Sequence, residues 1–350
     1  MSRVVRWTTF VIVLASWLLG CADGTSHTVT TTTSLTSSTT SSVMSEVYNP
    51  YAGTNPAVEP LGTVTKSSLS TPDGRVRTYR LYVPRSVGAQ DRVPLLVALH
   101  GGLGWGEQFA ANSGFDGLAE SNRFIVVYPD GTNARDGSTR LLTWNGGICC
   151  GPAVERNVDD VTYIRLMIDE IIRTNPVDDD RIFATGHSNG AFLAYRLACE
   201  LSDRISAIGV QAGALGVPCS PTRPVSVFHL HGVADTNIPI DGGRGTGVSG
   251  LEFPSPREAP VTFAAKNECG SGPVEQRDPS NPDVVAKVWS SCSQSRTVMF
   301  VTVAGASHAW MGHAGSSAGS TTLVGEPYEG FDASRAIWSF LAAQPVRPKG

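Results

Sequence analysis

A serine flanked by glycines offers the clearest chemistry in the sequence. The motif Gly-His-Ser-Asn-Gly, at residues 186–190, follows an apolar segment (182–184) and precedes a helix predicted over residues 191–201. Strand, sharp turn and helix form the context in which Gly-x-Ser-x-Gly presents a nucleophile. The glycines let strand and helix pass closely, and the helix start directs N–H groups toward an oxyanion at Ser188. The alternative is a glycine-rich turn with an incidental serine, and partners for Ser188 decide between the two.

A serine nucleophile needs a base and a third group that orients this base. In the α/β-hydrolase arrangement these partners follow in the order Ser, Asp, His. Asp235 follows a predicted strand (225–230), and His308 follows another (298–303). Open α/β sheets place their ligands at the carboxyl ends of such strands. We therefore expect Ser188, Asp235 and His308 to form a catalytic triad.

Other residues compete for these roles. Asp241 and His313 are the rival acid and base, but each lies further from the end of its strand. Asp235 could instead be an ordinary turn aspartate, and His308 a surface-loop histidine. The remaining histidines of the predicted domain are expected to hold loops or to pack; they are His100, His187, His229 and His231.

An oxyanion hole requires two N–H donors that face the developing negative charge. The N–H of Asn189, the residue after the nucleophile, is expected to be one of them. The other should come from the glycine loop after the predicted strand 93–99, where we choose Gly102 and rank Leu103 next. A phosphate-binding loop is the competing interpretation, but no Gly-Lys-Ser/Thr follows these glycines.

Apolar segments that alternate with amphipathic helices predict an α/β fold, with a mostly parallel sheet covered by helices on both faces. The predicted strands cover residues 78–84, 93–99, 124–128, 182–184, 205–210, 225–230 and 298–303, and the predicted helices cover 158–173, 191–201 and 332–343. Residues 241–292 look like an irregular insertion over the working edge of the sheet. We assign residues 47–346 to one catalytic domain.

The composition excludes some classes of partner. The 350 residues are 41% hydrophobic and 17% charged, with a formal net charge of −4 and no basic run. We therefore expect no nucleic-acid partner, and we expect a monomer. The triad chemistry requires no cofactor.

The N-terminus carries signals for export. Two arginines precede an apolar run (7–19) that is too short to span a bilayer, so residues 1–20 are predicted to be a signal peptide. The sequence Leu-Leu-Gly-Cys at its end resembles a bacterial lipobox, which would leave Cys21 as a lipid-modified first residue; an ordinary secretory signal is the alternative. Residues 21–46 are rich in Ser and Thr and are expected to form a disordered tether. We expect an exported protein, either anchored to the cell membrane by lipid or extracellular.

The other six of the seven cysteines form an even set, which favours disulfides in an exported protein. Order along the chain favours Cys199–Cys219 and Cys269–Cys292, which leaves the adjacent Cys149 and Cys150 either bridged to each other or partly free. A metal site is the alternative, but no Cys-x-x-Cys or paired-histidine spacing supports it, so we expect no metal.

Five motifs in combination resemble the polyhydroxybutyrate depolymerase/feruloyl esterase family, with exported Lpq-type lipoproteins of actinobacteria as the nearest likeness. They are Leu-His-Gly-Gly (99–102), Trp-Asn-Gly-Gly-x-Cys-Cys-Gly (144–151), Gly-His-Ser-Asn-Gly (186–190), His-Gly-x-x-Asp (231–235) and His-x-Trp (308–310). The resemblance covers nearly the whole predicted domain. It implies a carboxylic-ester hydrolase that uses Ser188, Asp235 and His308 on feruloyl, acetyl or hydroxyalkanoate esters, either small or borne by a polymer. Contact with a membrane is expected through the lipid anchor only.

The acyl pocket is less well defined by the resemblance. The histidine loop is Gly-Ala-Ser-His-Ala-Trp here, whereas relatives more often carry a His-Thr-Trp-Pro-Gly run. Trp144 and Trp310 are candidates for the pocket wall, because aromatic faces suit an aromatic acyl group; packing in the core is the equal alternative. Acyl transfer to an envelope alcohol, peptide hydrolysis and a non-catalytic envelope-binding lipoprotein are the competing functions.

Overall fold

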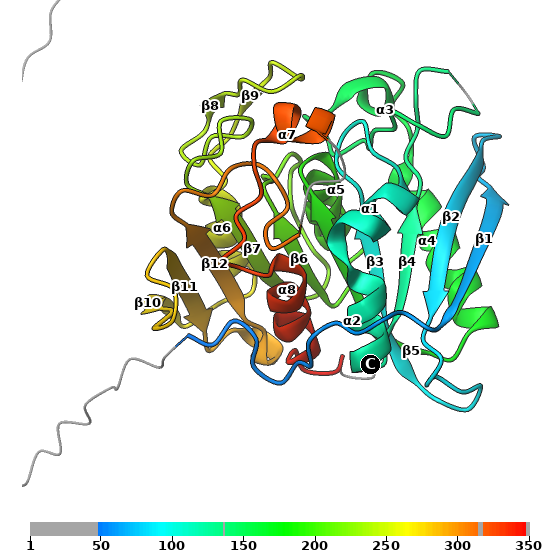
Figure 1. The fold of residues 1–350 in the computed structure, drawn as a ribbon, viewed down its shortest axis with the longest axis horizontal. Helices are drawn as coiled ribbons and strands as arrows, with labels where there is room; N and C mark the ends of the chain where they lie inside the picture. The colour runs from blue at the N-terminus through cyan, green and yellow to red at the C-terminus, as the bar shows by residue number, and fades with distance from the viewer. Residues whose placement is uncertain (1–47, 136, 314–317, 348–350) are drawn as a thin grey trace, which may run out of the picture. The chain divides into compact units, whose positions relative to one another are not determined.

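The computed structural model describes residues 48–135, 137–313 and 318–347 (Figure 1). The predicted signal peptide (1–20), Cys21 and the predicted tether up to residue 46 lie outside the described residues. No described helix is both long enough and apolar enough to cross a membrane.

A ten-stranded sheet organises the described part of the chain (Figure 1). In spatial order its strands are β1 (Thr63–Ser70), β2 (Val76–Val83), β4 (Ile125–Pro129), β3 (Val93–Leu99), β5 (Val177–His187), β6 (Ala207–Gln211), β7 (Ser226–Gly232), β12 (Val298–Val303), β11 (Val284–Ser290) and β10 (Ser271–Arg277). Neighbouring strands are parallel from β4 through β12, and the strands outside this block pair antiparallel. The predicted mostly parallel sheet is confirmed.

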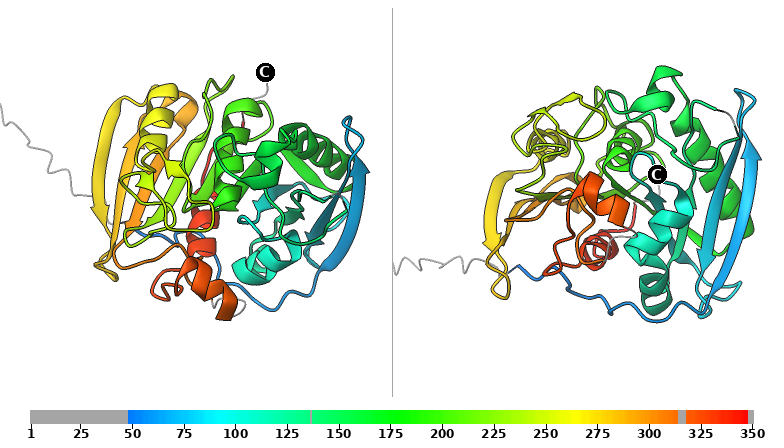
Figure 2. Two further views of the ribbon diagram at one scale, coloured as in Figure 1. Left: turned by 90° about the horizontal axis from the view of Figure 1, so that it is seen from above. Right: turned by 45° about the horizontal axis from the view of Figure 1, so that its top comes forward.

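Helices cover both faces of this sheet (Figure 2). On one face pack α4 (Asp160–Thr174), α5 (Asn189–Glu200) and α6 (Glu258–Lys266), and on the other pack α1 (Gly106–Ser113), α2 (Phe115–Asn122) and α8 (Ala333–Ala342). In β3, Leu95 and Val97 belong to the first core while Leu96 and Ala98 belong to the second. Burial on both faces explains why this strand is a continuous apolar run in the sequence.

Short elements gather where the parallel strands end. They are α3 (Gly151–Glu155), α7 (Ala318–Val324) and the two-stranded pair β8 (Gly243–Arg244) and β9 (Glu252–Phe253), which lie together at the top of Figure 1. A single turn, η1 (Ser293–Ser295), precedes β12. These short elements therefore cover the carboxyl edge of the sheet.

The prediction for residues 241–292 was wrong. Most of this segment is regular: it contains β8, β9, α6, β10 and β11, and the last two strands extend the main sheet. Edge strands carry mixed polar and apolar residues because one side faces solvent, which hides them from a search for buried runs. The segment that borders the site runs only from residue 247 to residue 253.

Three disulfides join elements of the described chain. Cys199–Cys219 ties the end of α5 to the segment before β7, and Cys269–Cys292 ties the segment after α6 to the segment after β11. The third joins the neighbouring residues Cys149 and Cys150, in the loop before α3. Chain order favours the first two pairings, and of the two alternatives left open for Cys149 and Cys150 the structure shows the bridge.

Candidate active site

Ser188 lies on a strained turn between β5 and α5. Its backbone has φ 53° and ψ −121°, a conformation that side-chain-bearing residues rarely adopt. A Cβ atom at Gly186 would lie 2.4 Å from the backbone of Gly190, and one at Gly190 would lie 2.3 Å from the carbonyl oxygen of Leu99. Both flanking positions therefore require glycine if the turn is to hold the serine hydroxyl clear of the sheet.

His308 and Asp235 stand next to this serine in a continuous hydrogen-bonded line. His308 Nε2 is 2.8 Å from Ser188 Oγ, and His308 Nδ1 is 2.7 Å from Asp235 Oδ2. Asp235 follows β7 and His308 follows β12, and these two strands are parallel neighbours. The fold thus brings together three residues spread over 120 positions of the chain. Their geometry is that of a nucleophile, a base and an orienting carboxylate.

Asp235 is held as a carboxylate. Its Oδ1 accepts hydrogen bonds from the N–H groups of Asn237 and Ile238, both at 2.9 Å. Burial by itself raises the pKa of Asp235, but the charge and hydrogen bond of His308, with His231 and the Ile238 N–H, outweigh burial and lower the pKa below its usual value. Asp235 therefore stays ionised at neutral pH and can orient the imidazole of His308.

Two N–H groups border the serine where an oxyanion would form. Asn189 is the first residue of α5, so its N–H has no acceptor within the helix. A Cβ at Gly102 would touch the Asn189 Cβ at 3.5 Å, which places the glycine loop directly beside this helix start. The N–H of Leu103 donates to Leu142 O at 2.8 Å, whereas within the described chain the Gly102 N–H has no acceptor. The geometry favours Gly102 over Leu103 as the second donor.

Two histidines fix the loops around the serine, the buried His100 and the half-buried His187. Gly131 N–H donates to His100 Nε2 at 3.0 Å, so His100 carries its proton on Nδ1 and donates it to Gly101 O at 2.8 Å. His187 Nε2 donates to the carbonyl oxygen of His308 at 2.7 Å. Burial lowers the pKa of His100 to about 4 and, together with the charge of His308, that of His187 to about 3. Both side chains are thus neutral hydrogen-bonding groups.

These two histidines predict a loss of stability in acid. Their pKa values in the folded state lie below the 6.5 of an exposed histidine, so the unfolded chain binds more protons once the pH falls below that value. We expect the free energy of unfolding to fall as the pH drops from about 6.5 toward 4, by up to about 1.4 kcal/mol per pH unit for each histidine. Urea denaturation across this range measures the decline.

The matched variant is His187→Gln, whose amide N–H can still donate to the carbonyl oxygen of His308 but does not titrate. Carboxylates contribute equally to both proteins, so the comparison isolates His187. We expect the variant to lose stability less steeply with falling pH, and equal slopes would contradict the assignment of His187 as a neutral group.

Sequence reasoning missed two side chains that hold the site. Gln211, at the end of β6, donates from Nε2 to Ala309 O at 2.7 Å and accepts from Met311 N–H at 3.2 Å, so it clamps the loop that carries His308. The Asn189 amide makes a similar pair of hydrogen bonds with the backbone of Trp144, at 2.7 and 3.0 Å. A glutamine at a strand end gives no sequence signal, because its role depends on a loop almost a hundred residues away.

Two cavities meet at Ser188. The larger, of about 450 Å³, runs from Ser188 and His308 to the Cys149–Cys150 disulfide and to Phe253 of β9. The smaller, of about 160 Å³, lies toward α1 and Trp310. Leu323 and Val324 at the end of α7 line both cavities. An ester at the serine thus has separate space for its acyl and its alcohol part.

The two tryptophans have different places. Trp144 is fully buried and borders neither cavity; its Nε1 donates to His100 O at 3.0 Å. The structure therefore places it in the core, which is one of the two equal alternatives that the sequence left open for it. Trp310 does line the smaller cavity, and it also packs edge-on against Phe109 and donates from Nε1 to Ser334 Oγ at 3.0 Å.

The rival acid and base do not join the triad. Asp241 is exposed and forms an ion pair with Arg257 at 2.7 Å. His313 borders the smaller cavity, but its Nε2 is 3.4 Å from Asp332 Oδ1 and it makes no hydrogen bond to Ser188 within the described chain.

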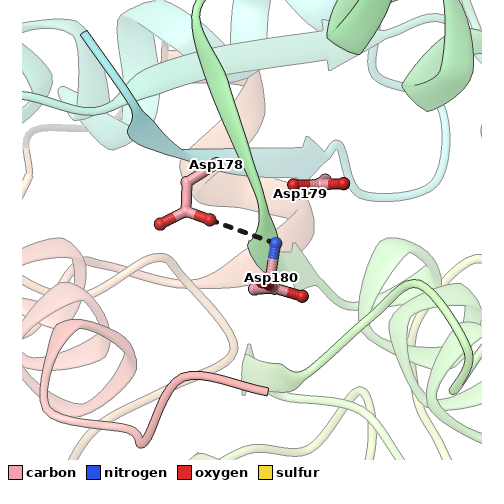
Figure 3. Close-up of side chains that lie close together, drawn as sticks. All are labelled: Asp178, Asp179 and Asp180. Carbon is pink, nitrogen blue, oxygen red and sulfur yellow. Dashed lines mark hydrogen bonds between the residues drawn. The ribbon is translucent and has the colours of Figure 1, made fainter. Parts of the chain in front are cut away.

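A cluster of three aspartates, Asp178 to Asp180, lies at the start of β5, at the opposite end of the strand from the nucleophile (Figure 3). Asp180 N–H donates to Asp178 Oδ1 at 3.2 Å. Asp178 is also paired with Arg181 at 2.7 Å, and Asp179 with Arg92 at 2.6 Å. Because arginines already neutralise two of the carboxylates, the cluster resembles an ordinary charged surface, and it adds nothing to the chemistry at the serine.

Comparison with known proteins finds that this chain is similar to esterases. Residues 77–235 match the family model for esterase PHB depolymerase, a range that includes Ser188 and Asp235 and ends before His308. Feruloyl esterase B of Piromyces equi is 29% identical over 234 residues, which are 65% of this chain and 41% of that protein. Poly(3-hydroxyalkanoate) depolymerase C of Paucimonas lemoignei is 27% identical over 268 residues, 69% of this chain and 60% of that protein. The match thus spans less than two thirds of either relative.

The fold has solved counterparts. The ferulic acid esterase AmCE1/Fae1A of the anaerobic fungus Anaeromyces mucronatus superposes with a TM-score of 0.51 at 14% sequence identity, over 85% of this chain and 95% of that chain. At this identity the likeness concerns the fold alone, and it confirms the predicted α/β-hydrolase architecture.

Proposed function

We propose that the chain is a member of the polyhydroxybutyrate-depolymerase esterase family, which it resembles over residues 77–235, and that it hydrolyses carboxylic esters through Ser188, His308 and Asp235. The observation that carries this proposal is the unbroken line of hydrogen bonds, 2.8 Å from serine to histidine and 2.7 Å from histidine to aspartate. A serine hydrogen-bonded to an imidazole that a carboxylate orients is the arrangement that activates a hydroxyl for attack on a carbonyl.

The reaction proceeds in two halves. Ser188 Oγ attacks the ester carbonyl while His308 Nε2 takes its proton, and the oxyanion accepts hydrogen bonds from the N–H groups of Gly102 and Asn189. His308 then gives the proton to the departing alcohol, which leaves an acyl group on Ser188. Water, deprotonated by His308, attacks this acyl-enzyme and releases the acid. Asp235 stabilises the imidazolium in both halves.

We propose that the larger group of the ester occupies the cavity beside Cys149–Cys150. Its wall includes Ile238, Leu251 and Phe253, which suit an apolar or aromatic group. The names of the relatives support two classes of ester, feruloyl esters and poly(3-hydroxyalkanoates), and the resemblance of the motifs adds acetyl esters.

The test uses the full chain, p-nitrophenyl acetate and a fluorophosphonate probe. We expect steady ester turnover that the probe abolishes, with one label located on the peptide that contains Ser188. A panel of methyl ferulate, acetylated xylan and hydroxybutyrate oligomers then ranks the substrate classes. No turnover of any of these esters and no labelling of Ser188 would overturn the proposal in favour of a non-catalytic envelope lipoprotein. Transfer of the acyl group to an added sugar acceptor, rather than to water, would redefine the enzyme as an acyltransferase.

We propose that the enzyme is exported. Three disulfides within the described chain support this, because such bonds persist in oxidising compartments. The lipobox-like sequence that ends at Cys21 supports a lipid anchor as the means of retention.

A further inference from the structure

Behind the triad lies a chain of buried polar side chains that the reaction described above does not use. Tyr195 Oη is 2.7 Å from His229 Nδ1, and His229 Nε2 is 3.1 Å from His231 Nδ1. His231 Nε2 is in turn 2.9 Å from Ile238 O and 3.5 Å from Asp235 Oδ2. Tyr195 and both histidines are fully buried. Burying three polar groups in a row is costly unless each finds its partner, and here every link is made.

The secondary structure explains how these residues meet. His229 and His231 are two residues apart on β7, so both side chains point to the same face of the sheet. That face is covered by α5, which carries Tyr195, and Phe300 of the neighbouring β12 packs edge-on against the His229 ring. The chain of contacts thus runs along β7 from the middle of the sheet to its carboxyl edge.

The carbonyl of Ile238 sets the direction of every hydrogen bond in this chain. Only an N–H can face a carbonyl oxygen at 2.9 Å, so His231 carries a proton on Nε2. Burial lowers the pKa of His231 and, with the charge of His231, that of His229, so each ring is neutral and carries a single proton. His231 Nδ1 must then accept from His229 Nε2–H, and His229 Nδ1 must accept from the Tyr195 hydroxyl. All three donors point toward Asp235.

We propose that Tyr195, His229 and His231 form a relay of positioning residues that holds Asp235 in place and polarises its carboxylate, a role that rests on the proposed esterase function. The peptide unit around Ile238 connects the relay to the triad, because the Ile238 carbonyl accepts from His231 while the Ile238 N–H donates to Asp235 Oδ1 at 2.9 Å. The relay therefore holds the turn that carries Asp235 in place, and the positive end of its three aligned dipoles faces the carboxylate of Asp235.

The relay acts on the chemical step and not on binding. None of its three residues lines either cavity at Ser188. The positive end of the aligned dipoles lies near Asp235, and it therefore also disfavours a positive charge on the neighbouring imidazole of His308. Arg257, whose guanidinium lies 6.0 Å from the Phe300 ring, is the remaining charged group that acts on His231. Loss of the relay should lower kcat, leave KM unchanged and move the acidic limb of the pH profile of kcat/KM to higher pH.

The experiment compares two single-atom deletions in buried tyrosines. Tyr195→Phe removes the first donor of the relay, whereas Tyr163→Phe, on α4, removes a hydroxyl that donates to Thr78 O at 2.6 Å, away from the site. For each full-length variant we would measure kcat, KM, the pH profile of kcat/KM and the midpoint of thermal unfolding. We expect Tyr195→Phe to lower kcat roughly 3- to 10-fold at constant KM, the size of effect that follows from losing one hydrogen bond. The acidic limb of the pH profile of kcat/KM should move to higher pH in this variant.

We expect Tyr163→Phe to match the wild type in kcat and pH profile even where its unfolding midpoint falls. The relay is overturned if the two variants have the same kcat and the same acidic limb, or if Tyr195→Phe changes KM alone. An inactive wild-type protein would instead refute the esterase proposal on which the relay rests. If the wild type is active and the two variants cannot be distinguished from each other, the relay proposal fails while the triad proposal stands.

Discussion

Replacing Ser188 by alanine is expected to lower kcat for p-nitrophenyl acetate by about 10⁵- to 10⁶-fold, the size of loss that follows removal of a triad nucleophile. The reason is chemical and not structural, because the hydroxyl projects from its turn and its one hydrogen-bond partner among the described side chains is His308. Any residual rate above that of water comes from the Gly102 and Asn189 N–H groups and from binding. The same variant should no longer react with the fluorophosphonate.

The control is Ser206→Ala, which removes a buried serine hydroxyl directly before β6, one that donates to Ile182 O at 3.1 Å. This variant should keep the activity and the labelling of the wild type. The unfolding midpoint of Ser188→Ala should stay close to that of the wild type, because the half-buried side chain loses only its hydroxyl and the one hydrogen bond to His308. Activity of Ser188→Ala within tenfold of the wild type would show that another residue supplies the nucleophile.

The meeting of Ser188, Asp235 and His308 was predictable because each residue sits at a position that the chain marks locally. Ser188 has a five-residue motif, while Asp235 and His308 each follow an apolar run at a distance of a few residues. Parallel strands place such positions at one edge of a sheet, so their meeting follows from topology. The contact between Asp235 and His308 is possible because β7 and β12 are parallel neighbours. Their meeting could be predicted without knowing that the two strands pair.

The surroundings of the triad depend on pairings that no local pattern encodes. Trp144 has the aromatic side chain that would suit a pocket wall, yet a hydrogen bond from its indole to His100 O fixes it in the core. The alternation of His229 and His231 along a strand marks one face, but nothing in the sequence states that Tyr195 of α5 covers that face. Interior polar partners become visible only when the packing of helix on sheet is known.

The predicted insertion failed for a related reason. Residues 241–292 contain few continuous apolar runs, because β10 lies at the edge of the sheet and β11 is only partly buried. Solvent on one side relaxes the demand for apolar residues, so an edge strand and a loop share the same composition. The part of this segment that shapes the larger cavity is irregular, and its course at Phe253 could not be derived from the sequence.

Asp235→Asn tests the orientation of the base, and we expect it to lower kcat by about 10⁴-fold with little change in KM. The neighbouring backbone determines how the side-chain amide that this substitution introduces must be oriented. Oδ1 of residue 235 accepts from the N–H groups of Asn237 and Ile238, so the oxygen of the asparagine must stay there and its NH₂ must take the place of Oδ2, 2.7 Å from His308 Nδ1. An NH₂ donor at that position forces the proton of His308 onto Nε2.

A histidine with its proton on Nε2 cannot accept the proton of Ser188, so the variant should bind ester normally and fail at attack. Steady-state kinetics separate these two effects, and fluorophosphonate labelling should slow in parallel with kcat because it needs the same activated serine. Asp241→Asn is the matched control: this residue is exposed, pairs with Arg257, and was the rival acid in the sequence. We expect it to retain wild-type kcat. A large loss in Asp241→Asn together with a small one in Asp235→Asn would reverse the assignment, whereas the expected contrast would tie the rate to the tautomer of His308 and not to the mere presence of a carboxylate near the site.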